Sequence, residues 1–397
     1  MKDMWAALTV VNWAIALGWV WRTITALRCL PRVPNLTEGR FAAPERKQGE
    51  VPSLTVIVPA RNEAAAIEST LESLLAQTLP LRVIAVDDRS TDGTGEIMER
   101  VAARPLPAGK QLTVIHLTEL PEGWLGKNHA LALAARQATT PWMLFTDGDV
   151  QFAPEALARA VYYAESAGAG HFVMLPTPIL HTGGERMMMS FLQVVVATAA
   201  NLWQIPDPKA KRESIGVGAF NLIRRDVYDG VGGFEALRME VLEDVRLGYT
   251  VKQKGYRQEV AFGPGLAQVH WAPGAMGIVS NLTKNAFAVF QFRLPLLLAA
   301  CVMLTIGCLA PVAGWFGSDA ARLACLVILA MQFLMYSYYR QFCDFSRWYF
   351  VTFPVAGMLF LYSILRSMWT TLRQGGVIWR GTFYPLRELR RYAGPIR

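Results

Sequence analysis

Four uncharged apolar segments constrain this chain more than any other feature. They comprise residues 4–21, 294–316, 323–339 and 349–365. The first is long enough to cross a bilayer at about 1.5 Å of helix rise per residue. The whole chain of 397 residues is 53% hydrophobic, which is rich for a soluble protein. We therefore expect a multi-pass membrane protein, with a transmembrane anchor at residues 1–24 and further membrane segments at 294–367.

Positive charge sets the expected orientation in the membrane. Arg22, Arg28 and Arg32 follow the first apolar segment and no A-x-A cleavage site is present, so we expect a retained anchor with its C-terminal flank in the cytoplasm. This predicts a cytoplasmic globular domain on a membrane of the bacterial inner-membrane type. Three crossings after that domain would leave the basic tail, residues 368–397, outside. One closing segment is therefore expected to be re-entrant or interfacial, and the sequence leaves open which.

Charge and motif content argue against several other classes of protein. The net charge of +8 lies mostly beside apolar segments, which favours a membrane surface over nucleic acid as the partner. The five cysteines and five histidines lack CxxC, HxH and HExxH spacings, so neither a disulfide framework nor a zinc site has support. The P-loop of an ATP-driven transporter is absent, and GVGAFN lacks the third glycine of a dinucleotide site.

Residues 50–290 alternate between strand-like and helix-like patterns. LTVIVPA is a continuous apolar, β-branched run, as expected for a strand covered on both faces. Strand-helix alternation with short loops predicts parallel βαβ units, hence an α/β domain of Rossmann-like type. Strands are expected at 54–60, 81–88, 112–117 and 142–149, with helices at 63–77, 94–105 and 126–139.

Polar clusters stand at the ends of three of these strands. Residues 59–63 end the first, 87–90 end the second and 147–149 end the fourth. In parallel sheets of this kind the ligand binds at the carboxyl ends of the strands. We therefore expect these clusters to converge on one edge of the sheet.

The sequence Asp147-Gly148-Asp149 is the strongest candidate for metal chemistry. The glycine lets the backbone turn sharply, so both carboxylates can face one hard cation such as Mg²⁺ or Mn²⁺. Such a clamp commonly holds a diphosphate. Asp149 is the expected ligand, with Asp147 acting directly or through water or ribose. The alternative is an ordinary TDGD turn.

A second acidic pair, Glu243-Asp244, precedes helix-like sequence. Asp244 is a candidate general base, because a carboxylate can accept the proton of an attacking hydroxyl, and Glu243 is expected to shape or assist it. The alternative is that both residues only cap the positive end of the helix that follows.

Five motifs occur in the order VPARNE, VDDRSTDGT, GKNHAL, DxD and ED. Together they resemble the family-two inverting glycosyltransferases with the GT-A fold, over roughly residues 50–270. The anchor, the closing segments and the late motif WRGTFY also resemble membrane-bound, non-processive members that glycosylate lipids, such as ceramide glucosyltransferase and the hopanoid- or carotenoid-associated enzymes. The Q-x-x-R-W motif of processive polysaccharide synthases is absent.

The resemblance implies a set of donor-binding residues, which are Pro59, Ala60, Arg61, Glu63, Asp88, Lys127 and Asp147. The carboxylate that matches Asp88 contacts uracil or ribose in the family, whereas the alternative is a cap or Asx-turn. Lys127 would approach the base or diphosphate, with a solvated lysine as the alternative. The family also places a loop near the donor sugar or acceptor, here at Gly216, Gly218 and Ala219.

The expected activity is transfer of a sugar from a nucleotide-diphosphate donor, preferably a UDP-sugar, to a lipid or lipid-linked hydroxyl with inversion. A non-catalytic membrane scaffold that binds lipid or nucleotide is the alternative.

Residues 187–203 are uncharged, but a single crossing there would separate Asp149 from Asp244. We expect this run to be an interfacial helix near the acceptor, with a core helix as the alternative. His270 is expected either to join the site or to be an ordinary buried histidine.

Overall fold

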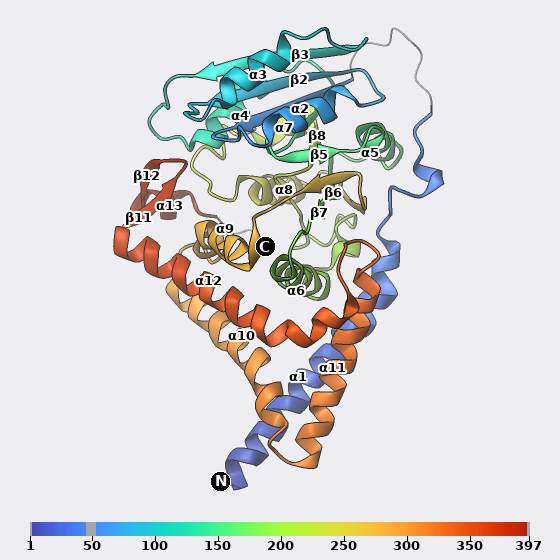
Figure 1. Cartoon of the computed structure of the whole chain (residues 1–397), viewed down its shortest axis with the longest axis vertical. Helices are drawn as coiled ribbons and strands as arrows, with labels where there is room; N and C mark the ends of the chain where they lie inside the picture. The colour runs from blue at the N-terminus through green and yellow to red at the C-terminus, as the bar shows by residue number, and fades with distance from the viewer. Residues whose placement is uncertain (1, 45–52, 395–397) are drawn as a thin grey trace.

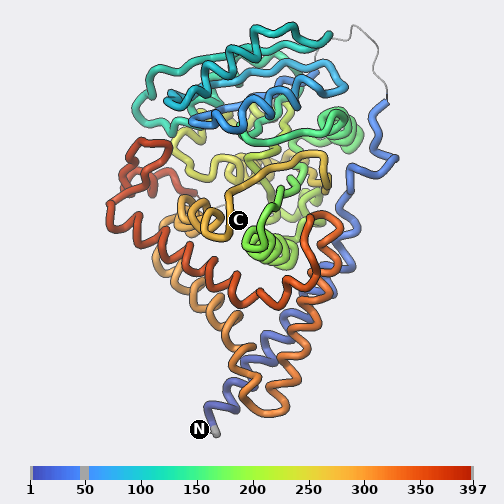
Figure 2. Tube along the Cα trace, viewed as in Figure 1, coloured from blue at the N-terminus to red at the C-terminus, as the bar shows by residue number. Residues whose placement is uncertain are grey.

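The computed structural model describes residues 2–44 and 53–394. An α/β domain sits above a tapering group of helices, and the N-terminus lies at the narrow tip of that group (Figures 1 and 2). Two sequence predictions extend beyond the described residues, namely the first residues of the 50–290 domain and residues 395–397 of the basic tail.

The α/β domain is built on a seven-stranded sheet of order β3-β2-β1-β4-β8-β6-β9. β1, β2, β3 and β4 are parallel, which confirms the predicted βαβ units, whereas β8 is antiparallel to both β4 and β6. The strands are β1 (Leu54–Ala60), β2 (Leu81–Asp88), β3 (Lys110–Leu117), β4 (Trp142–Phe145), β6 (His171–Leu175), β8 (Asn221–Arg224) and β9 (Gln258–Phe262).

Helices cover both faces of this sheet. Val56 and Val58 of β1 pack into one apolar cluster with α2, α3 and α5, whereas Ile57 points to the other face and packs with α4, α7 and α8. Alternate side chains of a strand point to opposite faces, so a strand buried on both sides needs the continuous apolar run seen in the sequence. The helices are α2 (Ile67–Leu75), α3 (Thr94–Ala102), α4 (Gly126–Gln137), α5 (Ala156–Ser166), α7 (Arg225–Val231) and α8 (Glu243–Gln253).

Four predicted elements are shorter than expected, and of these the helices predicted at 94–105 and 126–139 end at Ala102 and Gln137. The helix predicted at 63–77 is α2, Ile67–Leu75, because Glu63 belongs to the turn that follows β1. The strand predicted at 142–149 ends at Phe145, because the chain turns through Asp147 and Gly148 before β5. A small sheet of order β5-β10-β7 follows, formed by β5 (Val150–Phe152), β7 (Thr177–Pro178) and β10 (Ala267–Val269).

Four helical segments of the described chain are long and apolar enough to cross a membrane, one near the N-terminus and three near the C-terminus. They contain α1 (Lys2–Cys29), α10 (Leu294–Gly314), α11 (Asp319–Tyr339) and α12 (Phe353–Gln374). α1, α10 and α11 converge toward the tip, whereas α12 runs across them beneath the α/β domain (Figure 1). Short 3₁₀ turns lie at Leu30–Arg32, Gly39–Phe41, Leu202–Gln204 and Arg347–Thr352.

Two further helices, α6 (Gly183–Ala199) and α9 (Gly274–Val289), fill the layer between the sheet and α12 (Figure 1). α6 contains most of the uncharged run 187–203 and is not among the four candidate spans. It begins at a capping box formed by Thr182 and Glu185. Met188, Phe191 and Val194 are buried in a cluster that includes α1, α11 and α12 residues, so α6 joins the α/β domain to the apolar helices.

The end of the chain returns to the α/β domain. α12 ends at Gly375, whose left-handed φ of +69° allows a sharp reversal. β11 (Gly376–Trp379) and β12 (Thr382–Pro385) then form an antiparallel hairpin, and α13 (Leu386–Tyr392) follows. The region predicted as a tail is thus folded from residue 368 to 392.

Candidate active site

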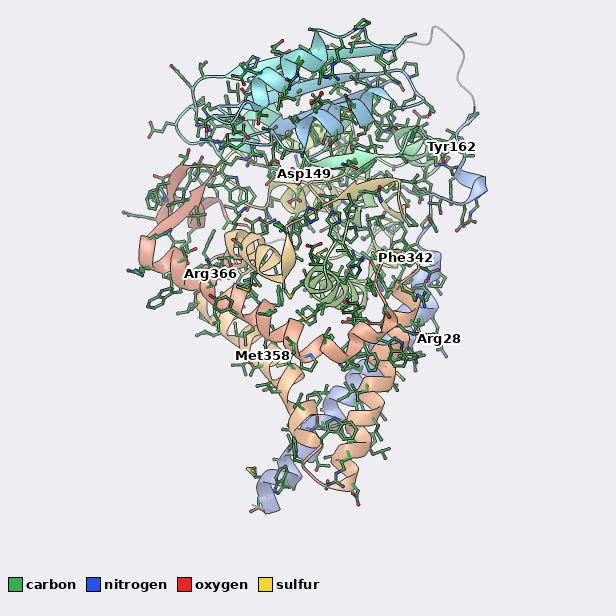
Figure 3. All side chains as sticks on the ribbon, viewed as in Figure 1. Arg28, Asp149, Tyr162, Phe342, Met358 and Arg366 are labelled. Carbon is green, nitrogen blue, oxygen red and sulfur yellow. The ribbon has the colours of Figure 1, made fainter. Side chains whose placement is uncertain are left out.

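The Asp147-Gly148-Asp149 segment links β4 to β5 in a tightly packed turn. The hydroxyl of Thr70 donates to the carbonyl of Gly148 at 2.9 Å. A Cβ at Gly148 would lie 3.1 Å from the Cβ of Ala60 at the end of β1, so an added side chain would require the turn or β1 to shift by a few tenths of an ångström. Figure 3 shows Asp149 on the part of the domain above Met358 and Arg366 of α12.

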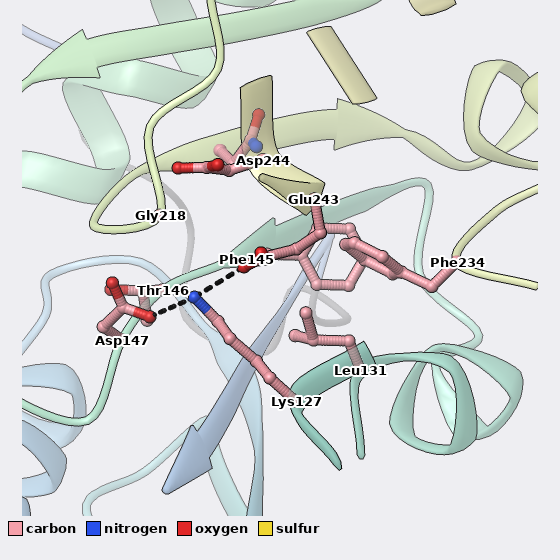
Figure 4. A pocket seen from close by; sticks show the side chains of 10 residues that line it. Lys127, Leu131, Phe145, Thr146, Asp147, Gly218, Phe234, Glu243 and Asp244 are labelled. Atoms are coloured by element: carbon pink, nitrogen blue, oxygen red, sulfur yellow. Dashed lines mark ion pairs between the residues drawn. The ribbon is translucent and has the colours of Figure 1, made fainter. Parts of the chain in front are cut away.

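Lys127 joins the two acidic pairs. It lies in the first turn of α4, and its Nζ is 2.7 Å from Asp147 Oδ1 and 2.7 Å from Glu243 Oε1 (Figure 4). Burial opposes its charge, but the carboxylates of Asp147, Glu243 and Asp244 outweigh burial and hold the pKa of the Lys127 ammonium above its usual range. The two acidic pairs, about a hundred residues apart in the sequence, thus meet at one ammonium group.

Asp244 lines the same pocket from the start of α8 (Figure 4). Its Oδ1 accepts a hydrogen bond from the Val245 backbone N–H at 2.8 Å. Burial, and then the neighbouring charge of Glu243, raise the pKa of Asp244 to about 7. A carboxylate with a pKa near neutrality is well matched to general-base work, because it can both accept and release a proton at working pH.

The glycine loop before β8 packs directly on both acidic pairs. A Cβ at Gly216 would overlap the carbonyl oxygen of Asp244, and one at Gly218 would lie 2.7 Å from Asp147 Oδ2. The carbonyl of Ala219 accepts a hydrogen bond from Thr146 Oγ1 at 2.8 Å. At Gly216 only glycine fits without moving backbone, whereas at Gly218 a Cβ would displace the Asp147 carboxylate, so the loop is packed against both Asp147 and Asp244.

Replacing Gly216 by alanine is therefore expected to displace the start of α8. Relieving an overlap with backbone should cost about 1–3 kcal/mol of stability, and the shift should lower turnover by moving Asp244. Thermal unfolding in detergent and a transfer assay would measure both effects. Gly39→Ala is the matched control, since a Cβ at Gly39 meets nothing within 4 Å. A Gly216→Ala protein as stable and active as the control would contradict the packing described.

Asp149 sits among like charges. Burial, and then the charges of Asp147 and Glu63, raise the pKa of Asp149 to about 7, and burial also raises the pKa of Glu63. Within residues 2–44 and 53–394 no group of three or more His, Cys, Asp or Glu side chains is placed to hold a metal ion. Mg²⁺ is typically bound through one or two carboxylates together with substrate phosphates. Asp147 and Asp149 are suited to that arrangement.

Arginines surround the buried carboxylate of Asp88 at the end of β2. Arg89 Nη2 lies 2.8 Å from Asp88 Oδ1, and Arg380 Nη1 of the C-terminal hairpin lies 3.4 Å from Asp88 Oδ2. The charges of Arg89 and Arg380 also act on Arg61 and, after burial, lower its pKa. Pro59 and Ala60, at the end of β1, pair with Val86 and Asp87 of β2.

Two backbone conformations mark this edge of the sheet. Asn62 and Arg89 follow β1 and β2 with φ of +56° and +59°, values that non-glycine residues adopt rarely. The side chain of Asn62 accepts a hydrogen bond from the Thr91 backbone N–H at 2.9 Å, which ties the two turns together. Sequence reasoning placed the polar clusters at the correct edge but gave Arg380 no role.

His270 follows β10 and approaches the start of β5. β10 pairs with β5 so that Val269 lies opposite Val150, and His270 is the next residue. Its Nε2 lies 3.6 Å from Glu185 Oε2. Burial disfavours the charge of Glu185, but backbone N–H donors of Gly274 and His181 outweigh burial and lower the pKa of Glu185 to about 2. His270 therefore lies beside the Glu185 carboxylate, which is ionised at neutral pH, at the start of α6.

The parallel strands, the strand-end clusters and the pocket between two acidic pairs are the features expected of the GT-A fold. Residues 55–246 match the family model described as glycosyl transferase family 2. The chain thus carries a glycosyl transferase family 2 domain.

Two curated relatives are 4,4'-diaponeurosporenoate glycosyltransferases of Staphylococcus aureus, from strains bovine RF122 / ET3-1 and MRSA252. Each is 25% identical over 345 residues, covering 85% of this chain and 89% of the relative. A solved structure with the same fold is the mannosyltransferase PcManGT from Pyrobaculum calidifontis in complex with GDP-Man and Mn²⁺. It is 21% identical with a TM-score of 0.53, covering 90% of this chain and 99% of that one.

Proposed function

We propose that this protein transfers a single sugar from a nucleotide-diphosphate donor, preferably a UDP-sugar, to a hydroxyl of an apolar lipid, with inversion. The observation that carries the proposal is the pocket in which Lys127 spans Asp147 and Glu243 with Asp244 alongside. The names of the S. aureus relatives specify diaponeurosporenoate, a carotenoid carboxylate, which supports a carotenoid-like lipid as the acceptor, whereas the hydroxyl as its accepting group rests on the Asp244 site alone. The apolar helices beneath the pocket offer a route for such an acceptor.

In the proposed reaction Asp244 removes the proton of the acceptor hydroxyl, which attacks the anomeric carbon from the face opposite the diphosphate. Lys127 pairs with Asp147 and with Glu243, the residue before the base, and so ties the start of α8 to the Asp147 turn. A divalent cation on Asp149 and Asp147 would neutralise charge on the leaving diphosphate, typically worth several kcal/mol. The Mn²⁺ bound in PcManGT, a protein of the same fold, supports Mn²⁺ or Mg²⁺ in this role.

Nucleotide release tests this proposal directly. Purified protein would be incubated with UDP- and GDP-sugars, an apolar lipid alcohol and Mg²⁺ or Mn²⁺. We expect release of one nucleoside diphosphate that depends on both the lipid and the cation. Release that no donor, acceptor or cation stimulates would exclude the proposal.

We further propose that only three of the four candidate spans cross the membrane. α11 ends near the α/β domain, where Arg186 of α6 pairs with Asp344 at 3.3 Å. α12 is followed by the hairpin that brings Arg380 to Asp88 at 3.4 Å. Because α12 both begins and ends beside the α/β domain, a crossing by α12 would separate contacts that lie on one side.

The surface of α12 fits a helix lying in the membrane interface. Exposed apolar side chains recur along α12 at intervals of three, four or seven residues and form one stripe. The stripe consists of Val355, Tyr362, Leu365, Trp369 and Leu372. Arg366 and Arg373 are exposed next to this stripe, and the helix also packs on α9 and α10. Apolar rings beside basic side chains favour the headgroup boundary. The basic tail then stays with the catalytic domain, as the positive-inside rule requires.

Cysteine labelling in intact cells would test this topology. We expect a membrane-impermeant maleimide to label Ala320→Cys, at the start of α11, in intact cells. Glu119→Cys in the α/β domain and Arg391→Cys in α13 should react only after permeabilisation. All three positions are exposed, and Cys29→Ser would remove the native cysteine that is not buried. Labelling of Arg391→Cys in intact cells would show that α12 crosses the membrane.

A further inference from the structure

We propose that Arg380, at the tip of the C-terminal hairpin, binds the phosphates of the donor and that the hairpin is the wall that completes the donor site. This inference rests on the proposed function and assigns a ligand to a residue outside the family-matched region, residues 55–246. The chemical class that Arg380 would recognise is the diphosphate of a nucleoside diphosphate.

Arg380 lies between the two parts of the site. Its guanidinium lies 3.4 Å from Asp88 on the nucleotide side of the sheet edge. Its charge also acts on Glu63 and Asp147, where it opposes the effect of burial on the pKa of Glu63 and helps Lys127 to lower that of Asp147. A diphosphate that joins a nucleoside near Asp88 to a sugar near Asp147 must pass this guanidinium.

Guanidinium groups are in local surplus around Asp88. Asp88 is fully buried and faces Arg89 and Arg380, while Arg61 lies beside the hairpin turn, 3.4 Å from the position of a Cβ on Gly381. The Arg61 Nη1 atom is buried without a hydrogen-bond partner. Three guanidiniums around one carboxylate leave donors that an anion can satisfy, and arginine binds phosphate oxygens with paired hydrogen bonds.

The backbone of the turn between β11 and β12 also points to a role for Arg380. Trp379 pairs with Thr382, so Arg380 and Gly381 form a two-residue hairpin turn with φ of +48° and +76°. Such turns favour Asn, Asp or Gly at the first position, because a long side chain with positive φ is strained. Arginine is a poor choice for the turn alone. A role for the Arg380 side chain beside Asp88 would explain why this turn carries an arginine.

The hairpin is held firmly enough to position this side chain. Val377 and Tyr384 are buried in a cluster with Leu125, which precedes α4, and Leu242, which precedes α8. Ile364 of α12 belongs to the same cluster. The elements that carry Lys127, Asp244 and Arg380 therefore share one apolar core with α12.

A ligand series on full-length protein in detergent would test the proposal. The wild type would be titrated, with Mn²⁺, against UDP and GDP, and then against the nucleoside and monophosphate of the better ligand. For Arg380→Ala we expect roughly 10- to 100-fold weaker diphosphate binding, as for loss of a hydrogen bond to a charged group, with nucleoside binding unchanged. Arg380→Lys should be intermediate. Arg387→Ala, an exposed arginine on α13, should match the wild type.

Each other outcome has a definite meaning. If Arg380→Ala weakens nucleoside and diphosphate binding equally, Arg380 only holds the hairpin in place and the proposal is wrong. If Arg380→Ala binds the diphosphate like the wild type, the proposal is also wrong, although the transferase function stands. If the wild type binds neither UDP nor GDP, the proposed function and this inference both fail.

Discussion

Asp244→Asn should lower turnover by roughly 10²- to 10⁴-fold while donor binding is retained, as expected when a general base is lost. Asparagine keeps the size of the side chain and the oxygen that can accept from the Val245 N–H, but it cannot take a proton. If Asp244 served only as a cap, the cost would be slight, because Asn caps a helix about as well as Asp.

Asp226→Asn provides a matched control for this experiment. Asp226 occupies the second position of α7, as Asp244 does in α8, but it is exposed and pairs with Arg224 at 2.5 Å. The control should keep wild-type turnover. If Asp244→Asn also turned over within a few-fold of wild type, the base would have to be another group, and Glu243 would be tested next.

Asp149→Ala should abolish divalent-dependent donor binding. If Asp147 and Asp149 are the two carboxylates that hold the cation, as we propose, removal of Asp149 leaves the diphosphate charge poorly compensated. Calorimetric titration with UDP in the presence and absence of Mn²⁺ would measure the loss, with the exposed Asp229→Ala as control. A variant that keeps the Mn²⁺-dependent affinity of the wild type would show that Asp149 is not a ligand.

The same assignment predicts a pH dependence. The pKa of Asp149 is raised to about 7, and a metal ligand must be deprotonated, so protons compete with the cation below that pH. Mn²⁺-dependent donor affinity of the wild type should therefore rise as pH increases through about 7. Affinity that stays flat across this interval would argue that Asp149 does not exchange a proton for the cation.

Local pattern predicted four of the seven strands of the main sheet and the edge at which the polar clusters meet. The runs Leu54–Ala60 and Leu81–Asp88 are strands with the predicted bounds, because their continuous apolar character reflects burial on both faces. The clusters after them converge as the parallel topology requires. The roles assigned to individual site residues remain predictions.

Contacts between distant segments could not be predicted from local pattern. Arg380 and Asp88 are 292 positions apart, and no periodicity links a hairpin turn to a strand end. The bridge from Lys127 to Asp147 and Glu243 likewise depends on how α4 and α8 pack. Hydropathy also does not separate a spanning α12 from the interfacial α12 that we propose, because length and composition alone say nothing about where its two ends lie.

The most direct test of the proposed transfer is to identify its product. Full-length protein in lipid vesicles would receive the donor it hydrolyses best, Mn²⁺ and an apolar polyene alcohol, and the lipid fraction would be analysed by mass spectrometry and NMR. The account predicts one added sugar per acceptor, with the anomeric configuration opposite to that of the donor, and no product from Asp244→Asn. A retained configuration, a polymer, or equal product from Asp244→Asn would contradict it.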